Sequence, residues 1–349
     1  MSKRAKLEVF FNHHWYIAKP GISYYFAQMA LMPLTLIFAL LSAIKRKLYQ
    51  LGLLKSYKLA VPVIVVGNIN IGGTGKTPLV IWLVEQLKLA GYTPGIISRG
   101  FGGNHQGEVF DNSNPQAFGD EPLLIAKRTL SPVFVGKNRV VAGQALLKVY
   151  PQCNFIISDD GLQHMQLQRD VEIAVVDSQR LFGNSHLLPA GPLREPLKGL
   201  SMLDAVVLNG DTPQNLNELQ GAFVMNLQAQ YLVNLYNNQI MITIAELNRK
   251  AEMDQVAISA VAGIGNPQRF FKQLITMGLQ FKSHAFPDHH QFVSTDLADD
   301  MANDMIVMTE KDAVKCKYFA NSRMWYLPIS AELPKGTELM AKILAKLTK

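Results

Sequence analysis

The sequence has very few cysteines and no repeated or low-complexity segment. Its 349 residues include two cysteines, Cys153 and Cys316, and neither belongs to a Cys-x-x-Cys pair. Two such cysteines exclude a disulfide framework and give no support to a structural zinc site. We therefore expect a globular protein in a reducing compartment.

Charged residues are also sparse, and they are mostly basic. They make up 17% of the chain, and 34 Lys and Arg against 27 Asp and Glu give a net charge of +7. This balance favours polyanionic partners: a nucleotide, a nucleic acid or an anionic membrane surface. No basic run is interleaved with aromatic residues, so nucleic-acid binding rests on net charge alone and we expect no nucleic-acid partner.

Only one long apolar run is present, over residues 22–44. It reads ISYYFAQMALMPLTLIFALLSAI, contains no charge, and is followed by Lys45, Arg46 and Lys47. About 20 apolar residues span a bilayer core, and basic residues mark its cytoplasmic side. We expect a membrane-associated helix with the rest of the chain in the cytoplasm. Whether it spans or, kinked at Pro33, enters one leaflet stays open, as does a buried core helix.

A glycine-rich turn stands between a predicted strand and a predicted helix. Residues 61–66 are apolar, residues 67–77 read GNINIGGTGKT, and residues 78–90 have helical periodicity. This order is typical of a phosphate-binding loop, in which backbone N–H groups and the helix N-terminus face an anion. Lys76 would reach the β- and γ-phosphates, and Thr77 would offer its hydroxyl to Mg²⁺. The predicted ATP-binding residues are Asn70, Ile71, Gly72, Gly73, Thr74, Gly75, Lys76 and Thr77.

The turn departs from the general pattern at Asn70, where a glycine is usual six residues before the lysine. Asparagine tolerates positive φ better than most residues, so we expect it to allow the same turn. A glycine-rich turn with a surface lysine is the structural alternative.

Acidic residues follow a second predicted strand. Residues 155–158 are mostly apolar and lead into Asp159 and Asp160, an arrangement in which the acid binds Mg²⁺. Strands at residues 93–98, 171–176 and 205–208 alternate with helices. They predict an α/β fold with a parallel sheet and helices on both faces. Arg99 ends the first of these, where α/β folds place ligand sites, although a solvated arginine is possible.

Three further segments carry polar residues that could act chemically. Asp120 and Glu121 begin a helix, either as capping residues or with one of them as a catalytic base. The proline-rich loop of residues 188–196 carries Arg194 and could present it or be a plain turn. His289 lies in an Asp-His-His sequence, for which an Asp–His pair that orients a base is the sharper interpretation, beside a metal pair and a surface turn.

The predicted organisation has four parts. We expect a membrane segment over residues 1–50, a P-loop core over 51–221, a linker with a short hairpin over 222–254, and a second, smaller α/β lobe over 255–349. Strands at residues 256–261 and 305–308 and a basic amphipathic helix at 336–349 belong to that lobe. The Gly-x-Gly at residues 263–265 is weak support for a dinucleotide site.

Taken in order, these motifs resemble tetraacyldisaccharide 4'-kinase, the lipid A 4'-kinase of the Gram-negative inner membrane. The resemblance covers nearly the whole chain and rests on VVGNINIGGTGKTP, SRGFGG, GDEP, SDDGLQH, FGN…LPAGPLREP, AGIGNPQRFF, DHH and VMTEKDAVKC. It implies transfer of the ATP γ-phosphate, with Mg²⁺, to the 4'-hydroxyl of a tetraacylated glucosamine disaccharide 1-phosphate at the cytoplasmic face of that membrane.

The resemblance also assigns roles. It implies that Asp120 acts on the attacking hydroxyl with His289 assisting, that Lys76 is catalytic, and that Asp159, Asp160 and Thr77 hold Mg²⁺. Arg99, Arg194 and Glu121 would contact the substrate. The expected partners are this glycolipid and membrane lipid; protein partners cannot be read from the sequence.

A membrane-associated switch ATPase of the MinD/ParA kind is the alternative function, since its loop also reads GGxGKT. That family carries a lysine directly before the two glycines, where this chain has Ile71. The difference favours the kinase.

Overall fold

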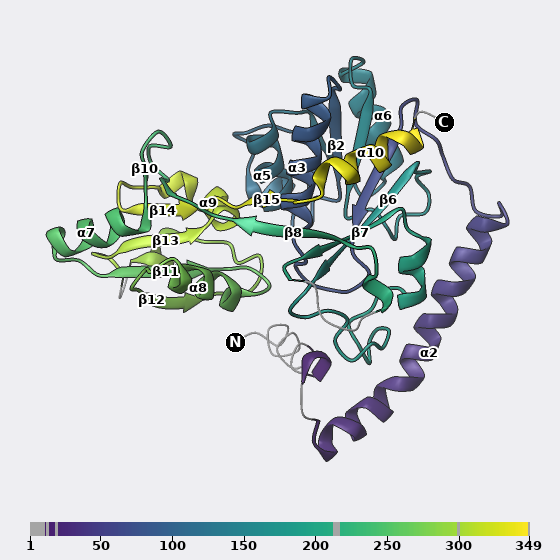
Figure 1. Cartoon of the computed structure of the whole chain (residues 1–349), viewed down its shortest axis with the longest axis horizontal. Coiled ribbons are helices and arrows are strands. Elements are labelled where there is room, and N and C mark those ends of the chain that lie inside the picture. Colours follow the sequence, from purple (N-terminus) through teal and green to yellow (C-terminus); the bar gives the residue numbers. More distant parts are fainter. Residues whose placement is uncertain (1–10, 12–13, 18–19, 212–216, 299–300, 348–349) are drawn as a thin grey trace. The chain divides into compact units, whose positions relative to one another are not determined.

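The computed structural model describes residues 11, 14–17, 20–211, 217–298 and 301–347. The chain divides into two compact units, whose elements are labelled in Figure 1. Unit 1 comprises Met1–Arg99, Gly136–Asn226 and Glu332–Lys349, and unit 2 comprises Gly100–Val135 and Leu227–Ala331. Each unit therefore joins segments that are far apart in sequence. Residues 100–135, which the sequence-based division placed in the P-loop core, belong to unit 2, and residues 332–349, which it placed in the second lobe, belong to unit 1.

Unit 1 is built on a parallel sheet. Its strands run in the order β8-β7-β6-β1-β5-β2, so β1 lies in the middle between β6 and β5. The strands are β1 (Val63–Gly67), β2 (Pro94–Ser98), β5 (Phe155–Asp159), β6 (Val171–Asp177), β7 (Ala205–Asn209) and β8 (Phe223–Gln228). The helices are α2 (Ile22–Gln50), α3 (Lys76–Leu89), α6 (Arg139–Val149), α10 (Gly336–Leu347) and the short 3₁₀ turns η1 (Leu197–Met202) and η2 (Asn217–Leu219). The predicted parallel α/β fold is confirmed.

The middle of this sheet is fully buried, as parallel strands covered by helices are. All five residues of β1, β2 and β5 are buried. Helix α3 buries seven apolar residues, Leu79, Val80, Ile81, Trp82, Leu83, Val84 and Leu87. This packing fixes the loop between β1 and α3 at both ends.

Helix α2 buries polar side chains and exposes apolar ones. It is continuous over 29 residues and runs through Pro33. Its buried residues are Gln28 and Thr35, whereas Phe26 is 68% exposed and Leu36 64%. This distribution is the reverse of a core helix, so the buried-core interpretation of the apolar run is wrong.

Unit 2 contains a second sheet, in the order β10-β9-β14-β13-β11-β12. Strands β12, β11, β13 and β14 are parallel, and the hairpin β9–β10 adds antiparallel to β14. The strands are β9 (Leu232–Asn234), β10 (Met241–Ile242), β11 (Ile258–Ala262), β12 (Lys282–Ala285), β13 (Met305–Thr309) and β14 (Met324–Leu327). The helices are α7 (Ile244–Asp254), α8 (Pro267–Thr276), α9 (Glu310–Cys316), η3 (Ser294–Leu297) and η4 (Lys317–Phe319).

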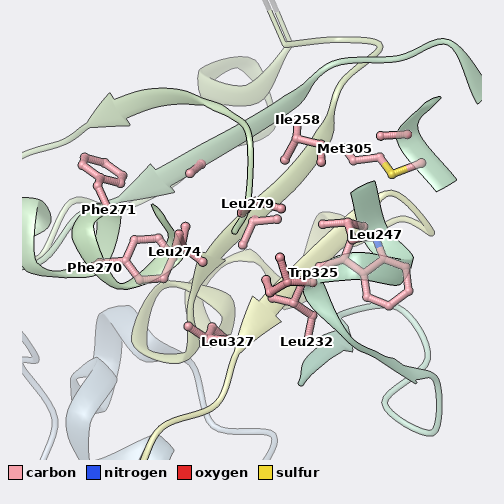
Figure 2. Packing of buried hydrophobic residues seen from close by; sticks show 14 of the residues in the cluster. Leu232, Leu247, Ile258, Phe270, Phe271, Leu274, Leu279, Met305, Trp325 and Leu327 are labelled. Carbon is pink, nitrogen blue, oxygen red and sulfur yellow. The ribbon is translucent and has the colours of Figure 1, made fainter. Parts of the chain in front are cut away.

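Side chains that alternate along these strands build two cores. Met305, Val307 and Trp325 point to the face covered by α7 and α8, in the cluster that Figure 2 shows with Leu247, Phe270 and Leu274. Their neighbours in the strands, such as Ile306 and Tyr326, point to the other face, with Ala313 and Cys316 of α9. Because strand side chains alternate between the two faces, one of the two sets packs against α9 and holds that helix on the sheet.

The segment from residue 100 to 135 completes unit 2. It holds an antiparallel pair, β3 (Gly107–Val109) and β4 (Val133–Val135), and two helices, α4 (Pro115–Phe118) and α5 (Asp120–Thr129). The chain passes back to unit 1 through β15 (Ser330–Glu332). Local sequence patterns did not predict β3, β4 and α4 in this segment, nor α6, β8, β12 and β14 elsewhere in the chain.

Residues 222–254 are more regular than the predicted linker. The hairpin β9–β10 is present, but β8 pairs in parallel with β7 and α7 fills eleven residues. Thr243 and Glu246 form a capping box at the start of α7. The Thr243 side chain accepts from the backbone N–H of Glu246, and the Glu246 side chain accepts from the backbone N–H of Thr243. The polar composition of this stretch did not predict a helix, although the Thr243–Glu246 spacing of a capping box could have indicated one.

Candidate active site

The loop between β1 and α3 has the geometry of an anion-binding loop. Gly75 forms the N-cap of α3 in the left-handed conformation, with φ +93°. A Cβ at Gly75 would collide with Nδ2 of Asn209, the last residue of β7. Asn209 Nδ2 donates to the carbonyl of Thr74 at 2.9 Å and so supports the loop from β7, which is separated from β1 by β6. Glycine is needed here for both conformation and space.

Asn70 does not replace the usual glycine in the way the sequence suggested. It is absent from the residues with positive φ and instead forms an isolated β-bridge with Leu193. Its Nδ2 donates to the carbonyl of Leu181 at 3.1 Å, and Ile71 N donates to the carbonyl of Pro192 at 2.8 Å. The expectation of a positive φ was wrong, because the loop of residues 188–196 pairs with this stretch and keeps it extended.

The side chains of Lys76 and Asn68 are held in place by hydrogen bonds within the loop. Lys76 Nζ donates to Oδ1 of Asn68 at 3.2 Å, and Asn68 Nδ2 donates to the carbonyl of Gly72 at 3.2 Å. The Thr74 hydroxyl is buried and has no hydrogen-bond partner among the residues that the structure describes. Such a hydroxyl is suited to donate to an anion held by the loop.

The two predicted acids lie at the end of β5, beside this loop. Asp159 is paired in register with Val66 of β1 and is buried, and Ser98 Oγ donates to its Oδ2 at 3.2 Å. Asp160 follows with a positive φ of 49°, and its Oδ1 lies 3.5 Å from Lys76 Nζ. The structure thus brings together Lys76, Asp159 and Asp160, as the sequence predicted for a nucleotide site.

Basic side chains surround Asp160. Arg194 Nη1 donates to its Oδ1 at 3.3 Å. Burial alone would raise the pKa of Asp160, but the charges of Lys76, Arg194 and Arg139 outweigh it and hold that pKa below its usual range. Asp160 is therefore ionised at neutral pH, as a magnesium ligand must be.

The donor set fits Mg²⁺ in a nucleotide site. No group of three His, Cys, Asp or Glu side chains that could hold a metal occurs in the described part of the chain. Mg²⁺ rarely uses such a cage; it is bound through one or two carboxylates, water and phosphate oxygens. Two adjacent carboxylates at the end of β5, with Thr77 in the first turn of α3, meet that description.

The loop of residues 188–196 contributes more than Arg194. Gln163 Nε2 donates to Oε1 of Glu195 at 2.8 Å and to the carbonyl of Asn68 at 3.2 Å, and Gln163 Oε1 accepts from Arg194 Nη1 at 3.3 Å. This network joins the loop, the SDDGLQH segment and the phosphate loop. The sequence analysis gave Gln163 and Glu195 no role.

Arg139 is a second group that sequence reasoning missed. It is 3% exposed, and its guanidinium donates to the carbonyl of Gly136 at 3.0 Å and to that of Asp160 at 3.4 Å. Burial lowers the pKa of His164 to about 4, with the nearby charge of Arg139 adding to the effect. His164 is therefore neutral and accepts from the backbone N–H of Arg139 at 3.3 Å. Arg99, in contrast, is exposed at the end of β2.

In unit 2, Asp120 and His289 form a close pair. Asp120 is the first residue of α5 and 3% exposed, and His289 Nδ1 lies 3.2 Å from both of its carboxylate oxygens. His289 has a positive φ of 57°, and its ring packs against Phe101 with centroids 4.9 Å apart. His289 is thus paired with Asp120, which lies outside the Asp-His-His sequence, and the role of this pair stays a prediction.

The two pKa shifts within this pair are opposite. Burial would raise the pKa of Asp120, but the hydrogen bond from His289 and the charges of Lys311, His289 and Lys315 hold it far below its usual range. Burial would lower the pKa of His289, but the hydrogen bond to Asp120 raises it overall. A proton bound to this pair therefore resides on His289.

The remaining residues of this region have distinct partners. The N-cap of α5 is Gly119, and Asp120 Oδ1 also accepts from the backbone N–H of Glu121 at 2.9 Å, so a local structural role coexists with the pair. Glu121 Oε1 accepts from Lys311 Nζ at 3.0 Å. His290 pairs with Asp296 at 2.9 Å and so does not join His289 as a metal ligand.

A central parallel strand, a glycine-rich loop, a helix and paired acids on the next strand define a P-loop nucleotide-binding protein. The chain belongs to the tetraacyldisaccharide-1-P 4'-kinase family, LpxK, whose family model matches residues 27–348. It is a kinase that uses ATP to phosphorylate the 4'-hydroxyl of the tetraacylated disaccharide precursor of lipid A. The resemblance stated from the motifs is confirmed.

Individual relatives agree with this assignment. The tetraacyldisaccharide 4'-kinase of Methylobacillus flagellatus is 50% identical over 324 residues, covering 92% of both chains. That of an Azoarcus species is 48% identical over 313 residues, covering 88% of this chain and 89% of the relative. A solved structure of LpxK from Aquifex aeolicus in complex with ATP matches with a TM-score of 0.73 and 28% identity, covering 92% of this chain and 99% of that one. The MinD/ParA-like alternative is not favoured.

Proposed function

We propose that unit 1 binds ATP in its phosphate loop and that the Asp120–His289 pair of unit 2 takes the proton of the attacking 4'-hydroxyl. The observation that carries this proposal is the pair itself: a buried carboxylate and an imidazole held at 3.2 Å, in a family whose reaction is a phosphoryl transfer to a hydroxyl. Each assignment below concerns residues whose roles the family name alone does not give.

The loop from Asn70 to Thr77 is proposed to hold the phosphates. The left-handed turn at Gly75 and the N-terminus of α3 direct backbone N–H groups at an anion. The buried Thr74 hydroxyl supports this role, since it has no partner within the described residues. Lys76 is placed to neutralise the β- and γ-phosphates, which carry the charge that develops during transfer.

Asp159, Asp160 and Thr77 are the proposed magnesium ligands. Mg²⁺ held by these residues would neutralise the charge that develops on the phosphates during transfer. Lys76 and Arg194 keep Asp160 ionised and fix its orientation. The same arginine and Arg99 are proposed to contact the substrate, because guanidinium groups bind phosphate in a fixed geometry. Glu121 is proposed as a further substrate contact.

The proton is proposed to pass to the Asp–His pair as a unit. The 4'-oxygen forms its bond to the γ-phosphorus as the bond between that phosphorus and the ADP oxygen breaks, and the hydroxyl proton leaves toward Asp120. Because Asp120 has a depressed pKa and His289 a raised one, the proton comes to rest on His289. A carboxylate alone with so low a pKa would be a weak base.

Helix α2 is proposed to attach the kinase to the cytoplasmic face of the inner membrane. Its 29 residues include a stretch with mean hydropathy 2.0 of which 11% is buried. The exposed apolar side chains and the following Lys45, Arg46 and Lys47 support an interfacial or inserted helix. Membrane attachment would keep the enzyme beside a substrate whose acyl chains stay in the bilayer.

The direct test is transfer of label from γ-labelled ATP to the disaccharide 1-phosphate by the purified full-length protein with Mg²⁺. A labelled lipid that chemical analysis identifies as the 4'-phosphate is expected. Absence of labelled lipid, while a known kinase of the family is active in the same mixture, would remove the proposal. Label released as inorganic phosphate without lipid would favour the switch ATPase.

A further inference from the structure

Lys315 of α9 is buried between two carboxylates. Its side chain is 1% exposed, and Nζ lies 2.7 Å from Oδ1 of Asp312 and 3.5 Å from Oδ2 of Asp120. Nζ also lies 5.5 Å from the centre of the Phe292 ring. Lysine is almost never fully buried unless it is paired, so this position needs an explanation.

Asp312 holds Lys315 in place. It is fully buried, and its Oδ2 accepts from the backbone N–H of Gly263 at 2.9 Å and from the Thr309 hydroxyl at 2.7 Å. Thr309 in turn caps α9 by accepting from the backbone N–H of Asp312 at 3.1 Å. Every one of these partners sits at the end of a buried strand or at the start of α9, so the ammonium group has little freedom.

The same network reaches the histidine of the pair. The backbone N–H of His289 donates to the carbonyl of Gly263 at 3.2 Å, while Gly263 N–H donates to Asp312. A Cβ at Gly263 would lie 3.2 Å from Oδ1 of Asp312 and 3.3 Å from Cβ of His290, so the backbone approaches closely at this point. Asp312 is thus linked to Asp120 by the Lys315 side chain, and to His289 by the backbone of Gly263.

We propose that Lys315, fixed by Asp312, is a positioning residue of the kinase: it holds the Asp120 carboxylate ionised and oriented toward His289. This inference rests on the proposed role of the Asp120–His289 pair. It assigns a purpose to the VMTEKDAVKC segment, whose function the sequence did not reveal.

Two lysines of α9 contribute positive charge near Asp120, and they differ in distance and exposure. His289 approaches from the loop after β12, Lys311 and Lys315 from α9, and Glu121 from α5, with Asp288 next to His289. Lys311 is 3.8 Å from Asp120 but 3.0 Å from Glu121, and its side chain is 18% exposed. Lys315 is nearer to Asp120 and shielded from water, where a charge acts most strongly.

Removing this ammonium group has a defined electrostatic consequence. Asp120 and Asp312 would lose the cation that they share, and a proton on the Asp120–His289 pair would be favoured. The unprotonated pair is the form that accepts the hydroxyl proton. The acidic limb of the pH profile of kcat should therefore move to higher pH. A purely structural lysine would lower kcat equally at all pH values.

The test compares Lys315→Met with Lys317→Met in the full-length enzyme. Lys317 is an exposed lysine two residues further on, so the control removes the same charge from the same segment. For Lys315→Met we expect kcat at pH 7 to fall by roughly tenfold or more. The acidic limb of the kcat profile should move to higher pH by about one unit, and the KM for ATP should stay within about twofold of the wild-type value. Lys317→Met should match the wild-type enzyme in all three.

The double variant Asp312→Asn/Lys315→Met keeps the test decisive if the single variant does not fold. It removes the buried ion pair as a neutral unit, which is tolerated better than leaving one charge alone. Its upward shift should be smaller than that of Lys315→Met, because the Asp312 charge, which favours a proton on the pair, is removed as well. Circular dichroism and thermal melting report folding. A folded variant of either kind with an unshifted limb overturns the inference.

The proposed function has its own, separable test. If Asp120→Asn is inactive while Lys315→Met behaves like Lys317→Met, the pair is catalytic and Lys315 has no part in it. If Asp120→Asn retains wild-type kcat, the proposed role of the pair fails, and the inference about Lys315 fails with it.

Discussion

The ammonium group of Lys76 lies 3.5 Å from the carboxylate of Asp160, so the phosphate-loop lysine is paired with an acid from the end of the neighbouring strand. The two side chains are 13% and 28% exposed, and Asp160 also accepts from Arg194. This pairing places the cation that should contact the phosphates directly beside the acid that should contact Mg²⁺.

Lys76→Ala should abolish most of the activity. The change removes the charge that neutralises the β- and γ-phosphates, so kcat/KM should fall by orders of magnitude. Lys88→Ala, an exposed lysine near the end of the same helix, is the control and should stay near wild type. Lipid phosphorylation with labelled ATP measures both. Near-normal turnover of Lys76→Ala would show that ATP binds elsewhere.

Gly75→Ala should weaken ATP binding. The left-handed φ of +93° costs an L-residue about 1–2 kcal/mol, and the new methyl group would collide with Asn209. We expect the Kd for ATP to rise roughly tenfold or more, since 1.4 kcal/mol corresponds to a factor of ten. Gly199→Ala is a matched control because nothing lies near its Cβ position. Equal Kd values for the two variants would contradict the geometry of the loop.

Local pattern was enough to predict the phosphate loop and the strands around it. The runs at β1, β2, β5, β6 and β7 are apolar because both faces of a parallel sheet are covered, and such runs end where the polar site residues begin. Asp159 and Asp160 could therefore be placed beside Lys76 without a structure. The conformation of Asn70 could not, because it depends on pairing with Leu193, more than a hundred residues away.

Long-range pairing also decided what the sequence missed in unit 2. Asp120 and His289 are 169 residues apart, and the motifs named both, but no periodicity linked either to Lys315. The lysine reads as one polar position of a short helix. Only the packing of α9 against the sheet, with Cys316 and Ala313 in the core, turns it inward. Contacts of this kind are set by tertiary structure, which local pattern does not encode.

Charges placed on the exposed side of α2 should release the enzyme from membranes. Leu36 and Leu40 are 64% and 61% exposed, so aspartate at both positions disturbs no core packing, but each would cost about 2.5–3.5 kcal/mol in a bilayer. We expect the double variant to stay soluble and folded while its sedimentation with lipid vesicles is lost. Leu130→Asp, an exposed leucine of unit 2, is the control.

Deletion of residues 1–48 tests the same surface more severely and should also release the rest of the chain. Full sedimentation of the truncated protein at high salt would rule out α2 as the main attachment. Binding that salt abolishes would instead assign attachment to the basic surface, because salt screens exposed charges.

Asp120→Asn and His289→Ala should each lose most of kcat. An amide cannot accept the hydroxyl proton, and general acid–base catalysis contributes about 10²–10⁴-fold. The Oδ1 of asparagine can still accept from the Glu121 backbone N–H, so the fold and the KM for ATP should be unchanged. Single-turnover phosphorylation with saturating substrates isolates this step. A folded Asp120→Asn enzyme with nearly wild-type kcat would leave Asp120 a purely structural role.

The pH dependence of activity should follow His289. Its pKa is raised above the ordinary value of about 6.5, because the hydrogen bond to Asp120 outweighs burial. The pair accepts a proton only when His289 is neutral, so kcat/KM should rise with pH through this raised pKa. In Asp120→Asn the carboxylate is absent and burial remains, so any residual activity should have its acidic limb at lower pH.

The contribution of His289 to the stability of the enzyme should fall as pH rises, whereas activity rises. A group whose pKa is raised by folding stabilises the protein fully below its unfolded pKa, and this contribution is lost as pH rises through the folded pKa. At low pH the wild-type enzyme should therefore melt at a higher temperature than His289→Gln. This difference in melting temperature should disappear between about pH 6.5 and the midpoint of the acidic limb of the activity profile. Asp120, with a depressed pKa, contributes above its unfolded pKa and loses that contribution only in acid. Melting curves of both enzymes across this range, set beside the kcat/KM profile, should show the loss of stability ending near the pH at which activity is half-maximal. A loss that ends well away from that pH would mean that the titrating group that controls activity is not His289.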